Sequence, residues 1–132
     1  MKTLRPFFLT VDIGFILYWI ITYSGVIPGE YLFPDYHNAL LVTWNWSFFP
    51  LDIAISATGL GSIFLYRNGR SAWRSLALIS LVLTFCSGLQ AIAFWTIQGW
   101  FDLSWWLPNL FLMLYPLFFI PRFARATPDA TA

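Results

Sequence analysis

The chain has 132 residues, of which 59% are hydrophobic, 21% aromatic and only 10% charged. Soluble domains carry about one quarter charged residues, so this composition excludes an ordinary water-soluble fold. Four membrane spans of about 20 residues would use about 80 residues and leave short loops. The net charge of +1 argues against a nucleic-acid partner, because nucleic-acid binding needs a concentrated basic face.

Four apolar segments follow one another along the chain, each long enough to cross a membrane as a helix. Asp12 interrupts the first segment and Asp52 the second, whereas the third and fourth contain no formal charge. The second would be about 45 Å long as one straight helix, more than the ~30 Å hydrocarbon core, so we expect Pro50 to kink it. The sequence therefore predicts an all-α, four-helix transmembrane bundle. The predicted spans are residues 6–23, 38–66, 75–98 and 103–120.

The basic residues predict the orientation of this bundle. They precede the first span, fill the connection between the second and third, and follow the fourth, while the other two connections hold only acidic residues. Because basic residues near span ends stay on the cytoplasmic side, both termini are predicted to be cytoplasmic. Residues 1–123 then form one transmembrane domain and residues 124–132 a disordered tail. The basic residues are Lys2, Arg5, Arg67, Arg70, Arg74, Arg122 and Arg125.

Aromatic residues gather near the predicted outer ends of the spans. The amphipathic rings of tryptophan favour the headgroup level of a bilayer. We therefore expect these tryptophans to form an aromatic belt. They are Trp44, Trp46, Trp95, Trp100, Trp105 and Trp106.

Few residues are available for metal, redox or nucleophilic chemistry. The single cysteine, Cys86, offers no disulfide or C-x-x-C pair. The single histidine, His37, has no second ligand nearby and is predicted to be interfacial. We therefore expect no metal and no cofactor. No nucleophile–base pair stands out, so no catalytic residue is assigned.

Asp52 is the main candidate for a functional residue, because a carboxylate at the centre of a span costs about 2.5 to 3.5 kcal/mol and normally faces the bundle interior. It lies roughly 21 Å from the predicted cytoplasmic end of its span. On the same helical face are Asn45, Ser56 and Gly59. Polar or amphipathic residues of the other spans fall at similar depths, roughly 17 to 22 Å. They are Tyr18, Trp19, Ser87, Gln90 and Asn109.

This polar layer has two interpretations. It can be structural, with interhelical hydrogen bonds worth about 0.6 to 2 kcal/mol each. It can also form a pocket for a small amphipathic or cationic ligand, since a carboxylate and aromatic faces both attract an amine. Membrane lipid is the other expected partner, and the sequence is compatible with a homo-oligomer. The candidate ligand-binding residues are Asp52, Gln90, Asn109, Ser87, Trp19, Tyr18 and Asn45.

Asp12 is expected at a different depth, roughly 9 Å from the cytoplasmic end and about 12 Å from the level of Asp52. The two carboxylates are therefore not predicted to share a proton or to form an acid–base pair. Asp12 can reach toward Arg5 or Arg67 as an ion-pair partner. Alternatively, it carries the proton in a proton-coupled exporter of small molecules.

The third span carries a stripe of small residues, which suits close approach of a neighbouring membrane helix. The stripe consists of Ser80, Thr84, Ser87, Gly88 and Ala91.

Several strings resemble the YvaD-like family of small bacterial membrane proteins. They include Asp35-Tyr36-His37-Asn38 and the stretches at residues 12–19, 44–52, 83–90 and 105–116. The resemblance covers the chain up to about Pro121. It implies a four-span fold in the bacterial cytoplasmic (inner) membrane, and it assigns no catalytic role to any position.

A second, weaker resemblance concerns architecture alone. The order of two acidic spans, a small-residue span and a Tyr-Pro-rich span is similar to the sterol-isomerase and sigma-2-receptor type of bundle, which holds an amine or a sterol carbocation between carboxylates. Here Gln90 stands in the third span where a second central acid is needed. A sterol-isomerase-like, lipid-modifying enzyme is thus a further alternative that lacks one of its acids.

Overall fold

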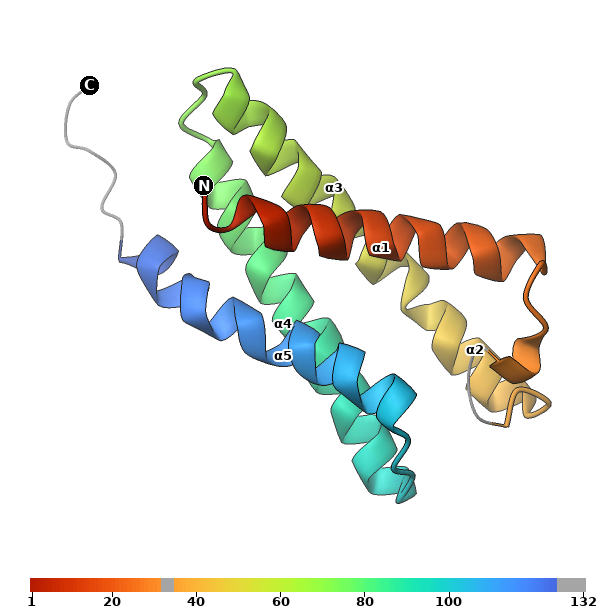
Figure 1. Cartoon of the computed structure of the whole chain (residues 1–132). Helices are drawn as coiled ribbons and strands as arrows, with labels where there is room; N and C mark the ends of the chain where they lie inside the picture. Colours follow the sequence, from red (N-terminus) through yellow and green to blue (C-terminus); the bar gives the residue numbers. More distant parts are fainter. Residues whose placement is uncertain (32–34, 126–132) are drawn as a thin grey trace.

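The structure, a computed structural model, describes residues 1–31 and 35–125. These residues are helical, with no strand among them (Figure 1). Four elements are long and apolar enough to cross a membrane, because α2 and α3 together make one of them. The predicted all-α, four-helix bundle is confirmed. The elements are α1 (Arg5–Ser24), the 3-10 turn η1 (Gly29–Tyr31), α2 (Ala39–Ser47), α3 (Phe49–Arg67), α4 (Trp73–Gln98) and α5 (Leu103–Ala124).

The helix ends follow from local sequence. Gly25 ends α1 and Gly99 ends α4, with φ angles of 65° and 71° that glycine adopts without steric cost. Asn38 and Asp102 cap the starts of α2 and α5. Their side-chain oxygens accept hydrogen bonds of 3.0 and 2.7 Å from the backbone N–H two residues further on.

The second span is interrupted where Pro50 predicts a kink. Helices α2 and α3 meet at Phe48, and Pro50 lies in the first turn of α3. Proline has no N–H to continue the helical ladder. Instead, the Phe48 N–H donates to the carbonyl of Asn45 at 3.1 Å, and the Asp52 N–H donates to the carbonyl of Phe48 at 2.9 Å. The interruption places Asp52 in the first turn of α3, close to the helix break.

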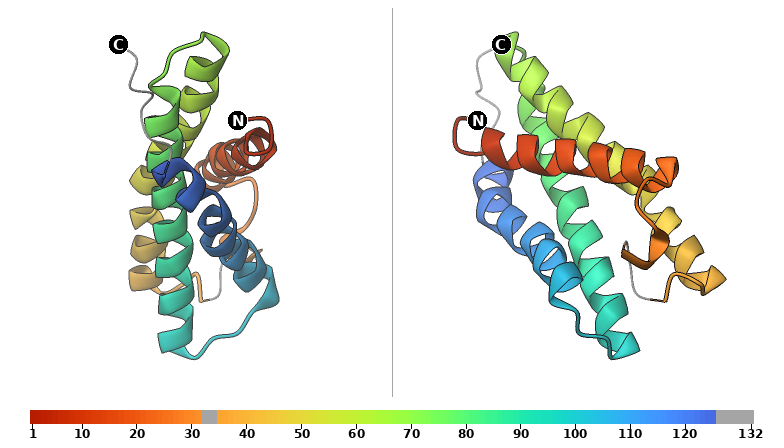
Figure 2. Two further views of the ribbon diagram at one scale, coloured as in Figure 1. Left: turned by 90° about the vertical axis from the view of Figure 1, so that its left-hand side faces the viewer. Right: turned by 45° about the vertical axis from the view of Figure 1, so that its right-hand side comes forward.

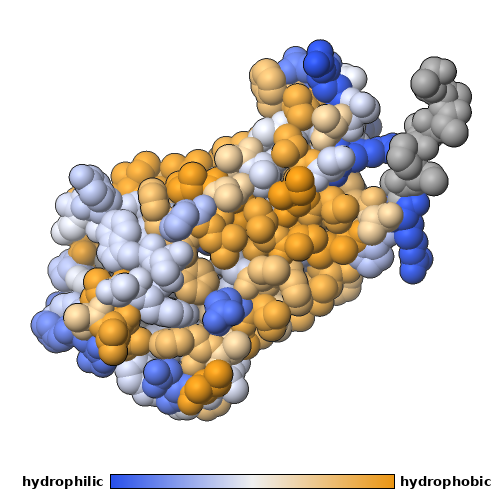
Figure 3. Space-filling view, turned by 180° about the vertical axis from the view of Figure 1, so that it is seen from behind, coloured by the Kyte–Doolittle hydropathy of each residue, from blue (hydrophilic) through white to orange (hydrophobic). Residues whose placement is uncertain are grey.

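Helix α4 contacts α3 and α5, and α1 crosses α3 obliquely (Figures 1 and 2). The beginning of α1, the α3–α4 connection and the end of α5 lie toward one end of the bundle, which we call the basic end because it carries the seven Lys and Arg residues. The α1–α2 and α4–α5 connections, with Glu30, Asp35 and Asp102, lie toward the opposite, acidic end. Between the two ends the surface is largely apolar (Figure 3).

The hydrophobic core lies in the half of the bundle near the basic end. Phe8 and Leu81 are fully buried there, and Phe7 of α1 stacks on Tyr115 of α5 with 5.1 Å between ring centroids. Toward the acidic end, α1 and α2 diverge from α4 and α5 (Figure 1). One half of the molecule is therefore closed by aliphatic and aromatic packing, and the other half holds the pocket described below.

The fourth span is longer than predicted. Helix α5 continues through Pro121 to Ala124, whereas the predicted span ends at residue 120. Proline lacks only the N–H that would bond the carbonyl four residues back. Its own carbonyl still accepts a hydrogen bond of 3.2 Å from the N–H of Arg125, so the helix continues past it. Of the predicted tail, Ala124 belongs to α5, and residues 126–132 lie outside the described residues.

Candidate functional site

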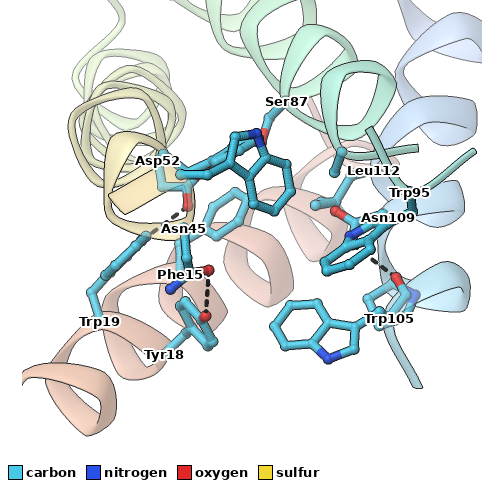
Figure 4. A pocket seen from close by; sticks show the side chains of 14 residues that line it. Phe15, Tyr18, Trp19, Asn45, Asp52, Ser87, Trp95, Trp105, Asn109 and Leu112 are labelled. Atoms are coloured by element: carbon cyan, nitrogen blue, oxygen red, sulfur yellow. Dashed lines mark hydrogen bonds between the residues drawn. The ribbon is translucent and has the colours of Figure 1, made fainter. Parts of the chain in front are cut away.

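A pocket of about 210 Å³ lies in the half of the bundle near the acidic end and is lined by all four membrane elements (Figure 4). A cavity of about 150 Å³ suffices to bind benzene, whereas drug-sized ligands occupy about 300 to 1,000 Å³. The pocket therefore has room for one ring or a short chain. Its aromatic lining is Phe15, Tyr18, Trp19, Trp44, Phe48, Trp95 and Trp105, and its polar lining is Asn45, Asp52, Ser87 and Asn109.

Asp52 is held in the pocket wall by donors from two other helices. Its Oδ2 accepts a hydrogen bond of 2.9 Å from the indole nitrogen of Trp19, and its Oδ1 accepts one of 3.3 Å from the hydroxyl of Ser87. The side chain is only 4% exposed. An indole N–H can only donate, so Oδ2 acts as an acceptor. This arrangement fixes the carboxylate at the meeting point of α1, α3 and α4.

A second polar pair closes the pocket beside Asp52. The hydroxyl of Tyr18 donates a hydrogen bond of 3.0 Å to Oδ1 of Asn45. The amide nitrogen of Asn45 is buried and has no hydrogen-bond partner among the described residues. A buried amide without a partner is costly, and Asn45 is one of the residues that line the pocket.

The two remaining amides of the predicted site, Asn109 and Gln90, are not among the hydrogen-bond partners of Asp52 in the structure. Asn109 lines the pocket, but its Nδ2 donates at 2.8 Å to the carbonyl of Trp105 on its own helix. Gln90 is exposed and does not line the pocket, so its predicted place beside Asp52 is wrong. At 3.6 residues per turn, Gln90 points about 120° away from the centre of the buried face of α4. Counting residues along the span predicts the depth of Gln90 but not the direction in which its side chain points around the helix axis.

The buried faces of α3 and α4 agree with the predicted stripes. Asn45, Asp52, Ser56 and Gly59 are all buried, as are the small residues of α4. Gly88 lies against the backbone of α5, because a Cβ at this position would lie 2.5 Å from the backbone nitrogen of Met113. The small residues therefore let the backbones of α4 and α5 approach closely, and two of them, Ser87 and Ala91, line the pocket.

Asp12 lies apart from the pocket. It is fully buried, and its carboxylate contacts Gly59 of α3, where a Cβ would lie 2.8 Å from the Asp12 Cγ. Ser56 donates to its backbone carbonyl at 3.1 Å, but neither carboxylate oxygen has a hydrogen-bond partner in the described part of the chain. The expected reach toward Arg5 or Arg67 is not made, because the side chain faces α3 rather than the basic end.

Three of the tryptophans predicted for the outer aromatic belt also line the pocket. They are Trp44, Trp95 and Trp105, and Trp44 also stacks on Phe94 with ring centroids 3.9 Å apart. The sequence held a signal for Trp95, which follows Ala91 by four residues and so continues the small-residue face of α4. Within residues 1–31 and 35–125, no group of three His, Cys, Asp or Glu side chains is arranged to hold a metal ion.

The four helical elements that are long and apolar enough to cross a membrane are those of a small polytopic membrane protein. A model of a family of unknown function, DUF5360, matches residues 4–130, and the chain therefore belongs to this family. The chain is 55% identical over 120 residues to the uncharacterized protein YvaD of Bacillus subtilis (strain 168), which covers 91% of this chain and 90% of that protein. The predicted resemblance to the YvaD-like family is thus confirmed. No solved structure matches the chain.

Proposed function

We propose that the pocket binds a small amphipathic molecule through a cationic nitrogen at Asp52. The observation that carries this proposal is the buried carboxylate of Asp52, which accepts hydrogen bonds from neutral donors only and lines an aromatic cavity. A buried charge is costly unless it is paired. No basic residue is among the described residues that line the pocket. A cationic ligand would supply the missing positive charge.

The aromatic walls favour the same class of ligand. Faces of tryptophan and tyrosine attract cations by about 0.5 to 2 kcal/mol, depending on desolvation. The free amide nitrogen of Asn45 complements an oxygen acceptor on the ligand. We therefore infer an amine with a nearby hydroxyl or carbonyl group and a ring or short chain that fits about 210 Å³.

The two alternative functions have less support. In a proton-coupled exporter based on Asp12, a substrate in the pocket would not touch the proton carrier, because Asp12 does not line it. A sterol-isomerase-like enzyme needs two carboxylates around its substrate. Asp12 packs at Gly59, seven residues beyond Asp52 and thus about 10 Å further along α3.

We propose further that the protein resides in the bacterial cytoplasmic membrane with its basic end inside, as the distribution of Lys and Arg favours. The pocket then lies in the outer half of the bilayer. Reporter fusions at Arg70 and at Glu30 test this orientation. A cytoplasmic signal at Arg70 and an external signal at Glu30 are expected, and the reverse result contradicts it.

The binding proposal is tested by thermal unfolding of the purified protein in lipid nanodiscs, with a series of small amphipathic amines and their neutral analogues. The variants are Asp52→Asn and, as a matched control, Asp102→Asn, which removes a carboxylate outside the pocket. Amines should raise the Tm of the wild type and of the control but not of Asp52→Asn, and neutral analogues should have little effect. Equal stabilisation of the wild type and Asp52→Asn contradicts the proposal.

Filling the pocket gives an independent check that keeps the carboxylate. Ala91 is buried in the pocket wall, so Ala91→Leu should reduce stabilisation by amines while Asp52 stays in place. Undiminished stabilisation of this variant would locate the ligand elsewhere.

A further inference from the structure

A second cavity, of about 240 Å³, lies at the basic end of the bundle. It is formed where the residues just before α1, the first turn of α4 and the last turns of α5 meet, and it shares no lining residue with the pocket around Asp52. Three segments far apart in the sequence therefore build it together. The residues that matter for its chemistry are Leu4, Trp73, Arg74, Phe119, Arg122 and Phe123.

Two arginines from different helices face this cavity without a nearby acid. Arg74 comes from α4 and Arg122 from α5. In the described part of the chain, the acidic residues are Asp12 and Asp52 inside the bundle and Glu30, Asp35 and Asp102 at the acidic end. The sixth acid, Asp129, lies outside the described residues. The cavity thus concentrates positive charge, which makes it suited to an anion.

An aromatic wall holds the arginine of α4 in place. The guanidinium of Arg74 lies 5.7 Å from the centre of the Trp73 ring, a distance that permits cation–π attraction. Trp73 in turn meets Phe123 of α5 edge to face, with ring centroids 5.7 Å apart. Part of the lining is apolar, since Leu4 and Phe119 belong to the hydrophobic core. The cavity therefore combines two arginines with apolar residues.

We propose that this basic cavity binds the phosphate group of an anionic phospholipid. Guanidinium groups match phosphate oxygens with paired hydrogen bonds. Basic pockets between membrane helices near the surface suit lipid headgroups, and tryptophan favours the same level of the bilayer. The apolar lining residues accommodate the glycerol backbone and the first methylene groups. This site is independent of the proposed amine pocket and stands if that proposal fails.

The test compares phosphatidylglycerol, phosphatidylcholine and inorganic phosphate as ligands of the purified full chain in detergent, with bound lipid counted by native mass spectrometry. The wild type should prefer phosphatidylglycerol, and each of Arg74→Gln and Arg122→Gln should weaken that binding about fivefold. Arg70→Gln is the matched control, because Arg70 lies at the same end but does not line the cavity. It should leave the preference unchanged.

Three results would overturn the proposal. Equal weakening by Arg70→Gln would mean that general surface charge attracts the lipid. Arginine-dependent binding of inorganic phosphate that excludes the lipid would assign the cavity to a soluble anion. If the glutamine variants fail to fold, Arg74→Lys and Arg122→Lys keep the charge but lose the paired geometry. Wild-type lipid preference in both lysine variants would contradict the assignment.

Discussion

The indole nitrogen of Trp19 on α1 donates a hydrogen bond of 2.9 Å to Oδ2 of Asp52 on α3, across 33 positions of the sequence. Trp19 is only 3% exposed, and its ring also packs against Trp46 and Phe49. This contact ties the second half of α1 to α3 at the level where α1 diverges from α4 and α5. It therefore joins the α1 and α3 walls of the pocket, and Tyr18 of α1 also meets Trp105 of α5, with ring centroids 6.3 Å apart.

Replacing Trp19 by phenylalanine should destabilise the protein, because Oδ2 of Asp52 loses its donor while most of the aromatic packing is retained. Interhelical hydrogen bonds in membrane proteins are worth about 0.6 to 2 kcal/mol, and we expect a loss in this range. The measurement is the free energy of unfolding in mixed micelles. In a double-mutant cycle with Asp52→Ala, which removes both acceptor oxygens, the double variant should lose less stability than the sum of the two single losses. Strictly additive losses would show that the bond contributes nothing.

The contact between α4 and α5 at Gly88 makes a second prediction. A Cβ at this position would lie 2.5 Å from the Met113 nitrogen and 2.7 Å from the Asn109 carbonyl oxygen, both of which are backbone atoms that cannot rotate away. Gly88→Ala should therefore separate the helices and lower stability by about 1 to 3 kcal/mol.

Gly14→Ala is the matched control for that experiment, since nothing lies within 4 Å of a Cβ there. It should leave the Tm unchanged or slightly raised, because alanine favours the helix. Equal Tm values for Gly88→Ala and the wild type would show that the two helices can move apart without cost.

Much of this architecture follows from one-dimensional features of the sequence. Hydropathy gives the four elements, Pro50 gives the helix break, and the spacing of small residues gives the buried face of α4. These features succeed because helix period and membrane thickness are fixed quantities. The direction of a polar side chain around its helix is harder to predict, as Gln90 illustrates. Depth in a span does not distinguish a lipid-facing position from an interior one.

The pocket itself was only partly predictable. Counting residues along each span predicts one depth for Asp52, Trp19 and Ser87. The structure brings these three side chains into contact. The divergence of α1 from α5 cannot be predicted in this way, because the angle at which two helices cross depends on how many side chains fit together. For the same reason, the place of Trp105 in the pocket wall does not follow from its position near the end of a span.

Asp102 predicts a pH effect at the start of α5. Hydrogen bonds from the hydroxyl and the backbone N–H of Ser104 hold the pKa of the Asp102 carboxyl below its usual value. A lowered pKa in the folded state means that the carboxylate stabilises the fold above its unfolded pKa. This contribution is lost as the pH falls through the folded-state pKa. Amide exchange in the first turn of α5 should therefore speed up at acidic pH relative to the intrinsic exchange rate.

Two substitutions separate the charge from the capping geometry. Asparagine is also a good N-cap, so Asp102→Asn should retain the protection of the first turn and remove its pH dependence. Asp102→Ala should lose protection at every pH. An unchanged pH dependence in Asp102→Asn would place the titrating group elsewhere.

The packing of Gly59 against Asp12 makes the last prediction. A Cβ at position 59 would overlap Oδ2 of Asp12, so Gly59→Ala should force the carboxylate or α1 to move and cost about 1 to 3 kcal/mol. Asp12→Ala removes the obstacle together with two buried oxygens that have no hydrogen-bond partner in the described part of the chain. The double variant should therefore be more stable than Gly59→Ala alone. Gly61→Ala, which meets only Leu76 at an ordinary 3.6 Å, is the control and should be unaffected by Asp12→Ala. Strictly additive effects at positions 12 and 59, measured by unfolding free energies, would contradict direct contact between them.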